Sequence, residues 1–242
     1  MPLGENGKPR SMGCMVLLKG KPYADRRQAA RLLGKSLAGY ETYHPLILGI
    51  PRGGVVVADT IAGELKTDLD IVLTRKLGAP GNPELAIGAV SESGRIYLQH
   101  EIAQKVGADE DYIEREIDRQ LTEIQARRQR YRSVLPKVSL EGRTVILVDD
   151  GVATGATMEA SLWAARAEGP KEIVIAVPVG AQDAIERLEH EADDVVCPYV
   201  PPYFYAIGQF YADFGQVDDQ EVIEILRTHR QQMQEQRQRT EG

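Results

Sequence analysis

The sequence predicts an α/β fold: an open parallel sheet flanked by helices, with a small hood and a helical insertion. Short apolar runs alternate along the chain with segments whose apolar residues recur at helical spacing. Glycine-containing loops follow several of these runs, as they do where a strand of a parallel sheet leads into a helix. A length of 242 residues with 43% hydrophobic content is enough to bury one sizeable core.

Five apolar runs are expected to form the parallel strands, and the run at 145–148 is expected to lie in the centre of the sheet. The five runs lie at 46–50, 70–74, 145–148, 172–179 and 194–197. Helices are expected at 23–40, after the glycines at 53–54 through Leu65, from 156, at 181–190 and from 222. Residues 16–226 are predicted to form one domain, with loose termini at 1–15 and 227–242.

Composition excludes several classes of protein. The net charge of −7 argues against nonspecific nucleic-acid binding, so an anion site must come from individually placed residues. The two cysteines, Cys14 and Cys197, are far apart and indicate neither a disulfide framework nor a zinc site, which fits a reducing cytoplasm. No apolar run reaches 18 residues, so no membrane span is predicted. Residues 1–14 are expected to be a loose leader, with Met12 or Met15 as alternative starts.

Residues 145–157, Val-Ile-Leu-Val-Asp-Asp-Gly-Val-Ala-Thr-Gly-Ala-Thr, are the most informative stretch. A buried strand, two carboxylates, a glycine loop and a helix start follow one another. The N–H groups and the dipole at a helix N-terminus favour a bound anion, and threonine hydroxyls add donors. The predicted phosphate-binding residues are Gly151, Val152, Ala153, Thr154, Gly155, Ala156 and Thr157.

The paired carboxylates of Asp149 and Asp150 argue against a simple triphosphate loop, because they would repel a phosphate that they faced. They fit a neutral hydroxylated group or a divalent cation instead. A ribose 5-phosphate meets both demands, with its phosphate in the loop and its hydroxyls on the carboxylates. An ordinary strand-to-helix turn with capping threonines would explain the glycines and threonines but not the two aspartates.

This motif resembles the phosphoribosyl pyrophosphate motif of type I phosphoribosyltransferases, and residues 23–226 resemble bacterial members whose acceptor is undefined. The resemblance implies a transfer of 5-phosphoribosyl to a nitrogen of a planar base or a related acceptor, with release of pyrophosphate. It implies Mg²⁺ as cofactor, held by Asp149 and Asp150 indirectly, through ligand or water. The two aspartates would also be the catalytic residues, because they stabilise positive charge on the sugar carbon.

Two other loops are expected to hold the pyrophosphate. Arg52, Gly53 and Gly54 follow the run at 46–50 and offer backbone N–H groups beside a fixed charge. Arg75 and Lys76 follow the run at 70–74, where open α/β sheets bind ligands. A basic pair alone is more often solvated, but this pair precedes a Gly/Pro-rich loop and resembles that of the adenine and orotate enzymes.

Residues 84–99 are expected to form two short strands, at 86–90 and 96–98, and in the family this region carries the mobile loop over the reacting centre. Glu84 and Glu92 are both acidic candidates there. Residues 100–135 are predicted to be a helical insertion, either a solvated surface helix or a hood or dimer contact. A homo-oligomer is therefore one expectation.

Aromatic residues concentrate in 198–217, next to prolines and glycine. The order resembles the base-binding tail of hypoxanthine-guanine enzymes, so Phe204 or Tyr205 is expected to stack on the acceptor. An aromatic mini-core at the sheet edge is the alternative. Ala153 replaces the purine-facing aspartate of those enzymes and resembles the adenine and uracil enzymes, so no base is assigned. Two other functions fit the same motif. One is a non-catalytic sensor of phosphoribosyl pyrophosphate or a nucleotide that regulates a partner. The other is a subunit of a larger enzyme that uses helix 109–130 as its contact.

Overall fold

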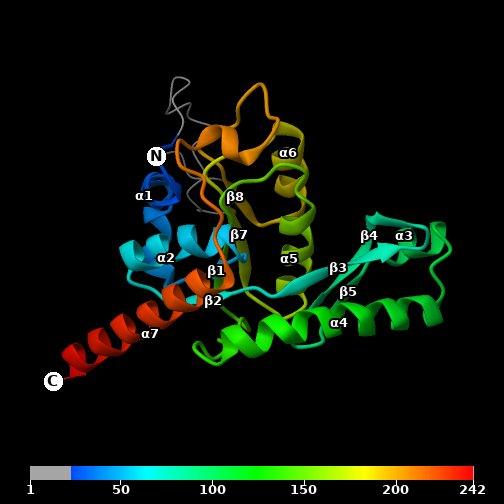
Figure 1. The fold of residues 1–242 in the computed structure, drawn as a ribbon, viewed down its shortest axis with the longest axis horizontal. Helices are drawn as coiled ribbons and strands as arrows, with labels where there is room; N and C mark the ends of the chain where they lie inside the picture. The colour runs from blue at the N-terminus through cyan, green and yellow to red at the C-terminus, as the bar shows by residue number, and fades with distance from the viewer. Residues whose placement is uncertain (1–22, 242) are drawn as a thin grey trace.

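The central layer is a five-stranded parallel sheet in the order β2-β1-β6-β7-β8, in a computed structural model that describes residues 23–241 (Figure 1). The strands are β1 (Leu46–Gly49), β2 (Leu69–Ile71), β6 (Thr144–Val148), β7 (Glu172–Ala176) and β8 (Asp194–Val196). All five residues of β6 are buried, and it pairs in parallel with β1 and β7. The predicted sheet and its central strand are confirmed. The expected leader at 1–15, its alternative starts and Cys14 lie outside the described residues.

Helices cover both faces of this sheet, because alternate strand residues point to opposite sides. Ile47 and Ile146 belong to one apolar cluster, with α1 (Arg26–Ser36), α2 (Gly53–Leu65) and α7 (Asp219–Glu241). Leu48 and Leu147 belong to the other, with α5 (Ala156–Arg166) and α6 (Gln182–Glu191). The chain also forms two short 3₁₀ helices, η1 (Ala38–Tyr43) and η2 (Ile207–Phe210). No helix in residues 23–241 is long and apolar enough to cross a membrane.

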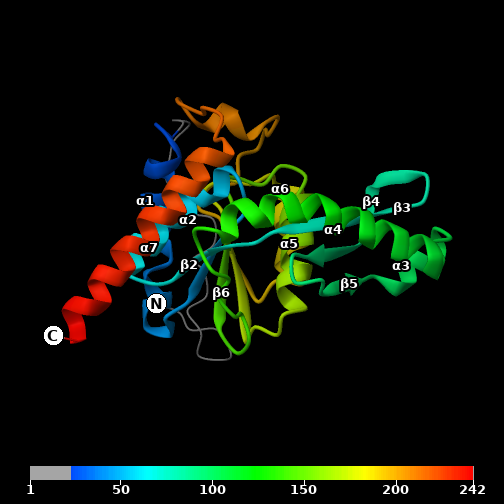
Figure 2. The same cartoon turned by 60° about the horizontal axis from the view of Figure 1, so that its bottom comes forward.

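A second, antiparallel sheet forms an arm that extends from the core (Figures 1 and 2). Its strands are β3 (Thr74–Ala79), β4 (Asn82–Ser91) and β5 (Ile96–Leu98), and α3 (His100–Lys105) and α4 (Glu110–Arg132) follow them. The strand expected at 70–74 is present in the parallel sheet as β2, but its predicted end is wrong: β2 ends at Ile71, and the chain enters the arm at Thr74. Arg75 and Lys76 therefore lie inside β3 rather than directly after a strand of the main sheet. A short apolar run indicates a strand, but it does not show where that strand ends or which sheet the chain joins next.

A buried ion-pair network fixes the C-terminal end of α4 to the core. The Arg132 guanidinium donates to both oxygens of Glu92, at 2.9 Å from its Nε to Oε2, and to Oδ1 of Asp70 on β2. The side chains of Glu92 and Asp70 are 3% and 1% exposed. Glu92, one of the acidic candidates for the mobile loop, is thus a buried partner of Arg132. The side chain of the other, Glu84, lies outside the described part of the structure.

The C-terminal helix is longer than expected. α7 runs from Asp219 to Glu241, so the tail predicted to be loose from Arg227 is helical. His229 is 4% exposed and faces Asp59 of α2, with 3.2 Å between Nδ1 and Oδ1. The polar composition of the residues after Arg227 favours a loose tail, and the few side chains that pack against α2 cannot be recognised from it.

Candidate functional site

The loop after β6 leads directly into the N-terminus of α5, as the motif predicts. Val152 fixes the loop, because its N–H donates to Val179 O (2.9 Å) and its carbonyl accepts from Ala181 N (2.8 Å). Gly155 adopts φ 81°, a left-handed conformation that glycine adopts without strain, and α5 begins at the next residue. The first N–H groups of α5 have no partners inside the helix, so they are available to an anion.

The loop residues differ in their access to solvent. Thr154 and Thr157 are exposed, and Ala153 and Ala156 are partly exposed. Gly151 and Val152 are buried, and a Cβ at Gly151 would press against Ile207. The structure therefore places the two threonines where they can meet a ligand, and gives Val152 a supporting position.

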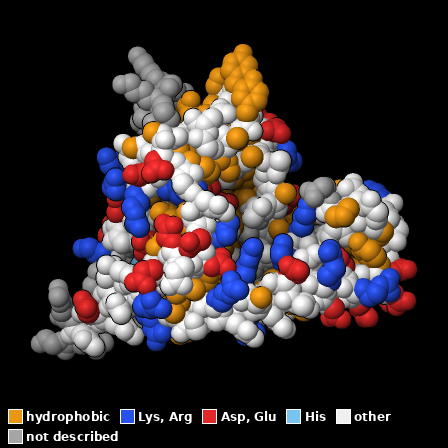
Figure 3. Space-filling model, viewed as in Figure 1, with side chains coloured by type: hydrophobic (Ala, Val, Ile, Leu, Met, Phe, Trp, Pro, Cys, Tyr) orange, Lys and Arg blue, Asp and Glu red, His pale blue; other side chains and the backbone are white. Residues whose placement is uncertain are grey.

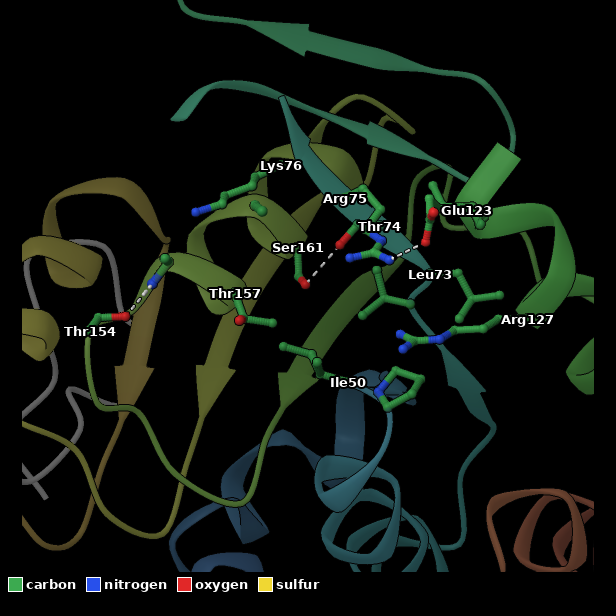
Figure 4. A pocket seen from close by; sticks show the side chains of 15 residues that line it. Ile50, Leu73, Thr74, Arg75, Lys76, Glu123, Arg127, Thr154, Thr157 and Ser161 are labelled. Atoms are coloured by element: carbon green, nitrogen blue, oxygen red, sulfur yellow. Dashed lines mark hydrogen bonds and ion pairs between the residues drawn. The ribbon is translucent and has the colours of Figure 1, made fainter. Parts of the chain in front are cut away.

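A cavity of about 470 Å³ lies beside this loop, between α5, β3 and α4 (Figure 4). Thr154 and Thr157 line one side, and the basic residues Arg75 and Lys76 of β3 line another. Lys and Arg side chains gather beside the hollow where the arm meets the core (Figure 3). The cavity thus joins a helix N-terminus to a cluster of cations, an arrangement suited to a ligand with more than one phosphate.

Helix α4 contributes two charged residues to this cavity that the sequence did not indicate. Glu123 Oε2 accepts from Arg75, at 2.9 Å to the guanidinium nitrogen, and Arg127 lies on the same side (Figure 4). The hydroxyls of Thr74 and Ser161 lie 3.2 Å apart across the cavity wall. The helical insertion is therefore part of the site.

The acidic pair lies against the start of α2. A Cβ at Gly53 would collide with Oδ2 of Asp150, and a Cβ at Gly54 would lie 2.8 Å from Oδ1 of Asp149 and 2.7 Å from Val148 O. The two glycines therefore allow the helix to approach both carboxylates. Arg52, the residue before α2, is exposed, and its peptide bond with Pro51 is cis.

Both carboxyl groups have raised pKa values. Burial is the main cause for Asp149, and the neighbouring negative charge of Asp150 adds to it, so the pKa of Asp149 lies well above its ordinary value. Burial also raises the pKa of Asp150, although the Arg26 guanidinium opposes the shift, with 2.7 Å between Nε and Oδ2. Ionising the two carboxyl groups is therefore unfavourable in the folded protein, and a bound ligand can reduce that free-energy cost.

The carboxylates suit a metal ion that arrives with a phosphorylated ligand. Within residues 23–241 there is no group of three His, Cys, Asp or Glu side chains that could hold a metal by itself. Mg²⁺ usually takes one or two protein carboxylates and completes its shell with water and substrate phosphates. Asp149 and Asp150 supply that number, and the Arg26 contact occupies one oxygen of Asp150.

The aromatic tail is divided between core and surface. Phe204 packs on Phe210, with 5.0 Å between ring centroids, in a cluster that includes Tyr23 and Tyr211. Tyr205 is 87% exposed, and Tyr203 is also exposed. Neither Phe204 nor Tyr205 lines the 470 Å³ cavity. The mini-core expected as the alternative is present, and it contains Phe204.

Sequence reasoning missed residues that reach the site from distant segments. Arg26, at the start of α1, contacts Asp150 across 124 positions, and the Tyr211 hydroxyl donates to Asp150 O (2.5 Å). Glu123 and Arg127 come from a helix whose charged faces are like any solvated surface. No local pattern marks Arg26, Glu123 or Arg127, because only the tertiary fold brings them to the motif. Tyr211 belongs to the aromatic stretch 198–217, but nothing in that stretch indicates its contact with Asp150.

Comparison with known proteins agrees with the fold and the motif. The phosphoribosyl transferase domain family matches residues 22–214. The chain is 41% identical over 211 residues to Rv0571c of Mycobacterium tuberculosis, whose name gives phosphoribosyl transferase as an unproven activity; the match covers 87% of this chain and 48% of that protein. The chain thus spans about half the length of that relative. A ribose-phosphate pyrophosphokinase from Sulfolobus acidocaldarius is 30% identical over 57% of this chain and 42% of its own length.

A solved structure extends the likeness to nearly the whole fold. The crystal structure of TT1426 from Thermus thermophilus superposes with a TM-score of 0.82 at 50% identity, over 86% of this chain and 98% of that one. The chain therefore belongs to the phosphoribosyl transferase family, and its domain is a phosphoribosyltransferase domain.

Proposed function

We propose that the protein transfers the 5-phosphoribosyl group of Mg²⁺-bound phosphoribosyl pyrophosphate to a nitrogen of a planar base or a related acceptor, and releases pyrophosphate. The observation that carries the proposal is the cavity in which the N-terminal loop of α5 meets Arg75, Lys76 and Arg127. A ligand with a phosphate at one end and a pyrophosphate at the other matches these two anion-binding parts.

In this proposal the loop 151–157 holds the 5-phosphate, with Thr154 and Thr157 as hydroxyl donors. Arg52, Gly53, Gly54, Arg75 and Lys76 hold the pyrophosphate, and Arg127 adds a third guanidinium beside Arg75. The carboxylates of Asp149 and Asp150 supply the negative charge that stabilises the positive charge developing on the sugar carbon as pyrophosphate leaves. Mg²⁺ would be held indirectly by Asp149 and Asp150, through ligand or water, and when bound would neutralise the negative charge of the leaving pyrophosphate.

The acceptor site is proposed on the side of the aromatic tail. Tyr205 presents its ring to solvent, and hydrophobic side chains over this segment project at the top of Figure 3. Ala153 offers no acid–base group to the acceptor, so a nucleophilic nitrogen would have to react without a carboxylate from that position.

Replacing Phe204 and Tyr205 one at a time should distinguish a role in acceptor binding from a role in the aromatic core. Tyr205→Ala is expected to weaken acceptor binding about 5- to 150-fold, since stacking on one base is worth about 1–3 kcal/mol in single-stranded nucleic-acid binding, and to leave the Tm unchanged. Phe204→Ala is expected to lower the Tm, because it removes a ring from the cluster of Phe210 and Tyr211. Melting curves and acceptor titrations on both variants check this; an equal loss of stability in both would contradict a binding role for Tyr205.

A second substitution tests the cation cluster. Glu123→Gln removes the carboxylate that pairs with Arg75, so Arg75 is freed for pyrophosphate. Exposed ion pairs are worth about 0.2–1 kcal/mol, so pyrophosphate affinity should rise by up to about fivefold. Calorimetry with Mg²⁺ and inorganic pyrophosphate measures it. Glu114→Gln, an exposed position on the same helix, is the control and should bind like the wild type. A weaker affinity in Glu123→Gln would show that Glu123 supports the anion site.

The activity itself is tested by pyrophosphate release. The protein is mixed with phosphoribosyl pyrophosphate, Mg²⁺ and each member of a panel of purines, pyrimidines and other planar nitrogen heterocycles, and pyrophosphate is measured. Release with at least one acceptor supports the enzyme. Saturable binding of phosphoribosyl pyrophosphate with no release in any mixture would favour the sensor over the enzyme.

A further inference from the structure

The side chain of Asp150 is held by protein groups rather than left open to a ligand. Its Oδ2 accepts from Arg26 Nε at 2.7 Å, and the two side chains are 10% and 12% exposed. Asp149 has no cation in hydrogen-bond contact among the described residues; its Oδ1 accepts only from the Asp150 N–H, at 2.8 Å. Two neighbouring carboxylates thus have different surroundings.

Arg26 is in turn fixed by the C-terminal tail. Its guanidinium carbon lies 3.9 Å from the ring centroid of Phe214, and its NH1 donates to Gly215 O at 2.8 Å. A cation over an aromatic face and a carbonyl acceptor hold the planar guanidinium in one orientation. The side chain therefore joins the acidic pair to the segment that carries the aromatic residues.

Backbone pairing reinforces this junction. Ala212 N donates to Tyr23 O (2.6 Å), and Asp213 N donates to Ala24 O (2.8 Å). The Tyr211 ring stacks on Phe214 at 5.0 Å, and its hydroxyl donates to the Asp150 carbonyl at 2.5 Å. Both the backbone and the side chain of Asp150 are thus tied to the same tail segment.

We propose that Arg26 is a positioning residue of the phosphoribosyl site, which holds Asp150 toward α1 and the tail and leaves Asp149 as the carboxylate that meets the ribose hydroxyls. This inference rests on the proposed function. Its physical basis is the repulsion between adjacent carboxylates, which weakens when a guanidinium pairs with one of them. Arg26 itself does not touch the ligand; it acts through Asp150.

The contacts of Arg26 with Asp150 and Phe214 also link the proposed ribose site to the proposed acceptor site. Phe214 and Tyr211 belong to the tail proposed to carry the acceptor, and Asp150 belongs to the ribose site. Loss of Arg26 releases Asp150 and removes the cation that Phe214 packs against. The consequence should therefore appear in phosphoribosyl pyrophosphate affinity and in turnover.

The test is a double-mutant cycle between Arg26→Gln and Asp150→Asn, with Arg26→Lys as the conservative variant and Arg31→Gln as the control. Arg31 is exposed on the same helix. Affinity for phosphoribosyl pyrophosphate with Mg²⁺, affinity for ribose 5-phosphate, kcat and Tm are measured for each. Loss of the hydrogen-bond partner of a metal ligand typically lowers affinity or activity about 10- to 100-fold, and a loss of this order is expected for Arg26→Gln. Arg26→Lys should recover part of it, and Arg31→Gln should match the wild type.

The cycle separates positioning from general damage, because residues that act as one unit give non-additive effects. Arg26→Gln should have little further effect on affinity when Asp150→Asn is already present. Additive losses, or a loss in Arg26→Gln that follows Tm alone and that Arg26→Lys does not recover, would overturn the positioning role while leaving the proposed function intact. A wild-type protein that binds neither ribose 5-phosphate nor phosphoribosyl pyrophosphate would overturn both.

Discussion

Asp149→Asn is expected to lower kcat strongly and at the same time stabilise the fold. The substitution removes the charge proposed to stabilise the cationic sugar carbon, and the loss of one such preorganised group typically costs about 100- to 1,000-fold in kcat. It also removes a carboxylate whose burial beside Asp150 is unfavourable. Stabilising substitutions of this kind contribute about 0.5–2 kcal/mol, or about 1–8 °C in Tm for a domain of this size.

The stability gain has a defined pH dependence. The pKa of Asp149 is higher in the folded protein than in the unfolded chain, so the folded state binds more protons between the two pKa values. The contribution of Asp149 to wild-type stability therefore falls as the pH rises from about 3.9, the ordinary pKa of aspartate, through the folded-state pKa. The Tm difference between Asp149→Asn and wild type should be largest at neutral pH and shrink toward pH 4.

Melting curves across this pH range, with Asp118→Asn as a control at an exposed carboxylate, measure the effect. The control should show no comparable gain. A variant that is less stable than wild type at pH 7, or that keeps full turnover, would contradict the assigned role of Asp149.

Arg132→Met is expected to destabilise the fold strongly. The guanidinium lies between Glu92 and Asp70, whose side chains are almost wholly buried. Removal of one partner from a buried ion pair leaves an uncompensated charge and costs about 3–5 kcal/mol. That loss corresponds to a fall of about 6–20 °C in Tm. The arm should loosen with it, because this network fixes the end of α4 to β2.

Two companion variants make the measurement specific. Arg128→Met removes a guanidinium that is 57% exposed and lies 3.8 Å from Glu92, so its Tm should stay close to that of wild type. Combining Arg132→Met with Glu92→Gln and Asp70→Asn removes the orphaned charges and should recover part of the lost stability. Equal losses for Arg128→Met and Arg132→Met would show that the network is not what fixes the helix.

The parallel sheet could be predicted from the sequence because strands buried on both faces require continuous apolar runs, as at Val145–Val148. The loop 151–157 and the acidic pair could also be predicted, because the chemistry is local: strand, carboxylates, glycines and helix start follow one another in the chain. The arm could not be predicted, since nothing in 70–74 shows that the chain leaves one sheet for another at Thr74.

The remainder of the site depends on contacts between distant segments. The chain entering α1 pairs with residues 211–213, which helps to bring Arg26 to Asp150. The contacts of α4 with β2 and β3, including that of Arg132 with Asp70, bring Glu123 and Arg127 to the cavity. From the sequence, Gly53 and Gly54 are expected only to bind pyrophosphate. In the structure they also leave room for the side chains of Asp149 and Asp150. Contacts of this kind cannot be predicted from the hydrophobic periodicity or the composition of a single sequence.

The decisive measurement is a calorimetric titration of the wild-type protein with phosphoribosyl pyrophosphate in the presence of Mg²⁺. We expect saturable binding at one site per chain, competition by inorganic pyrophosphate, and a large loss of affinity in the Asp149→Asn, Asp150→Asn double variant. The absence of saturable binding in the wild type, or undiminished affinity in the double variant, would contradict this prediction.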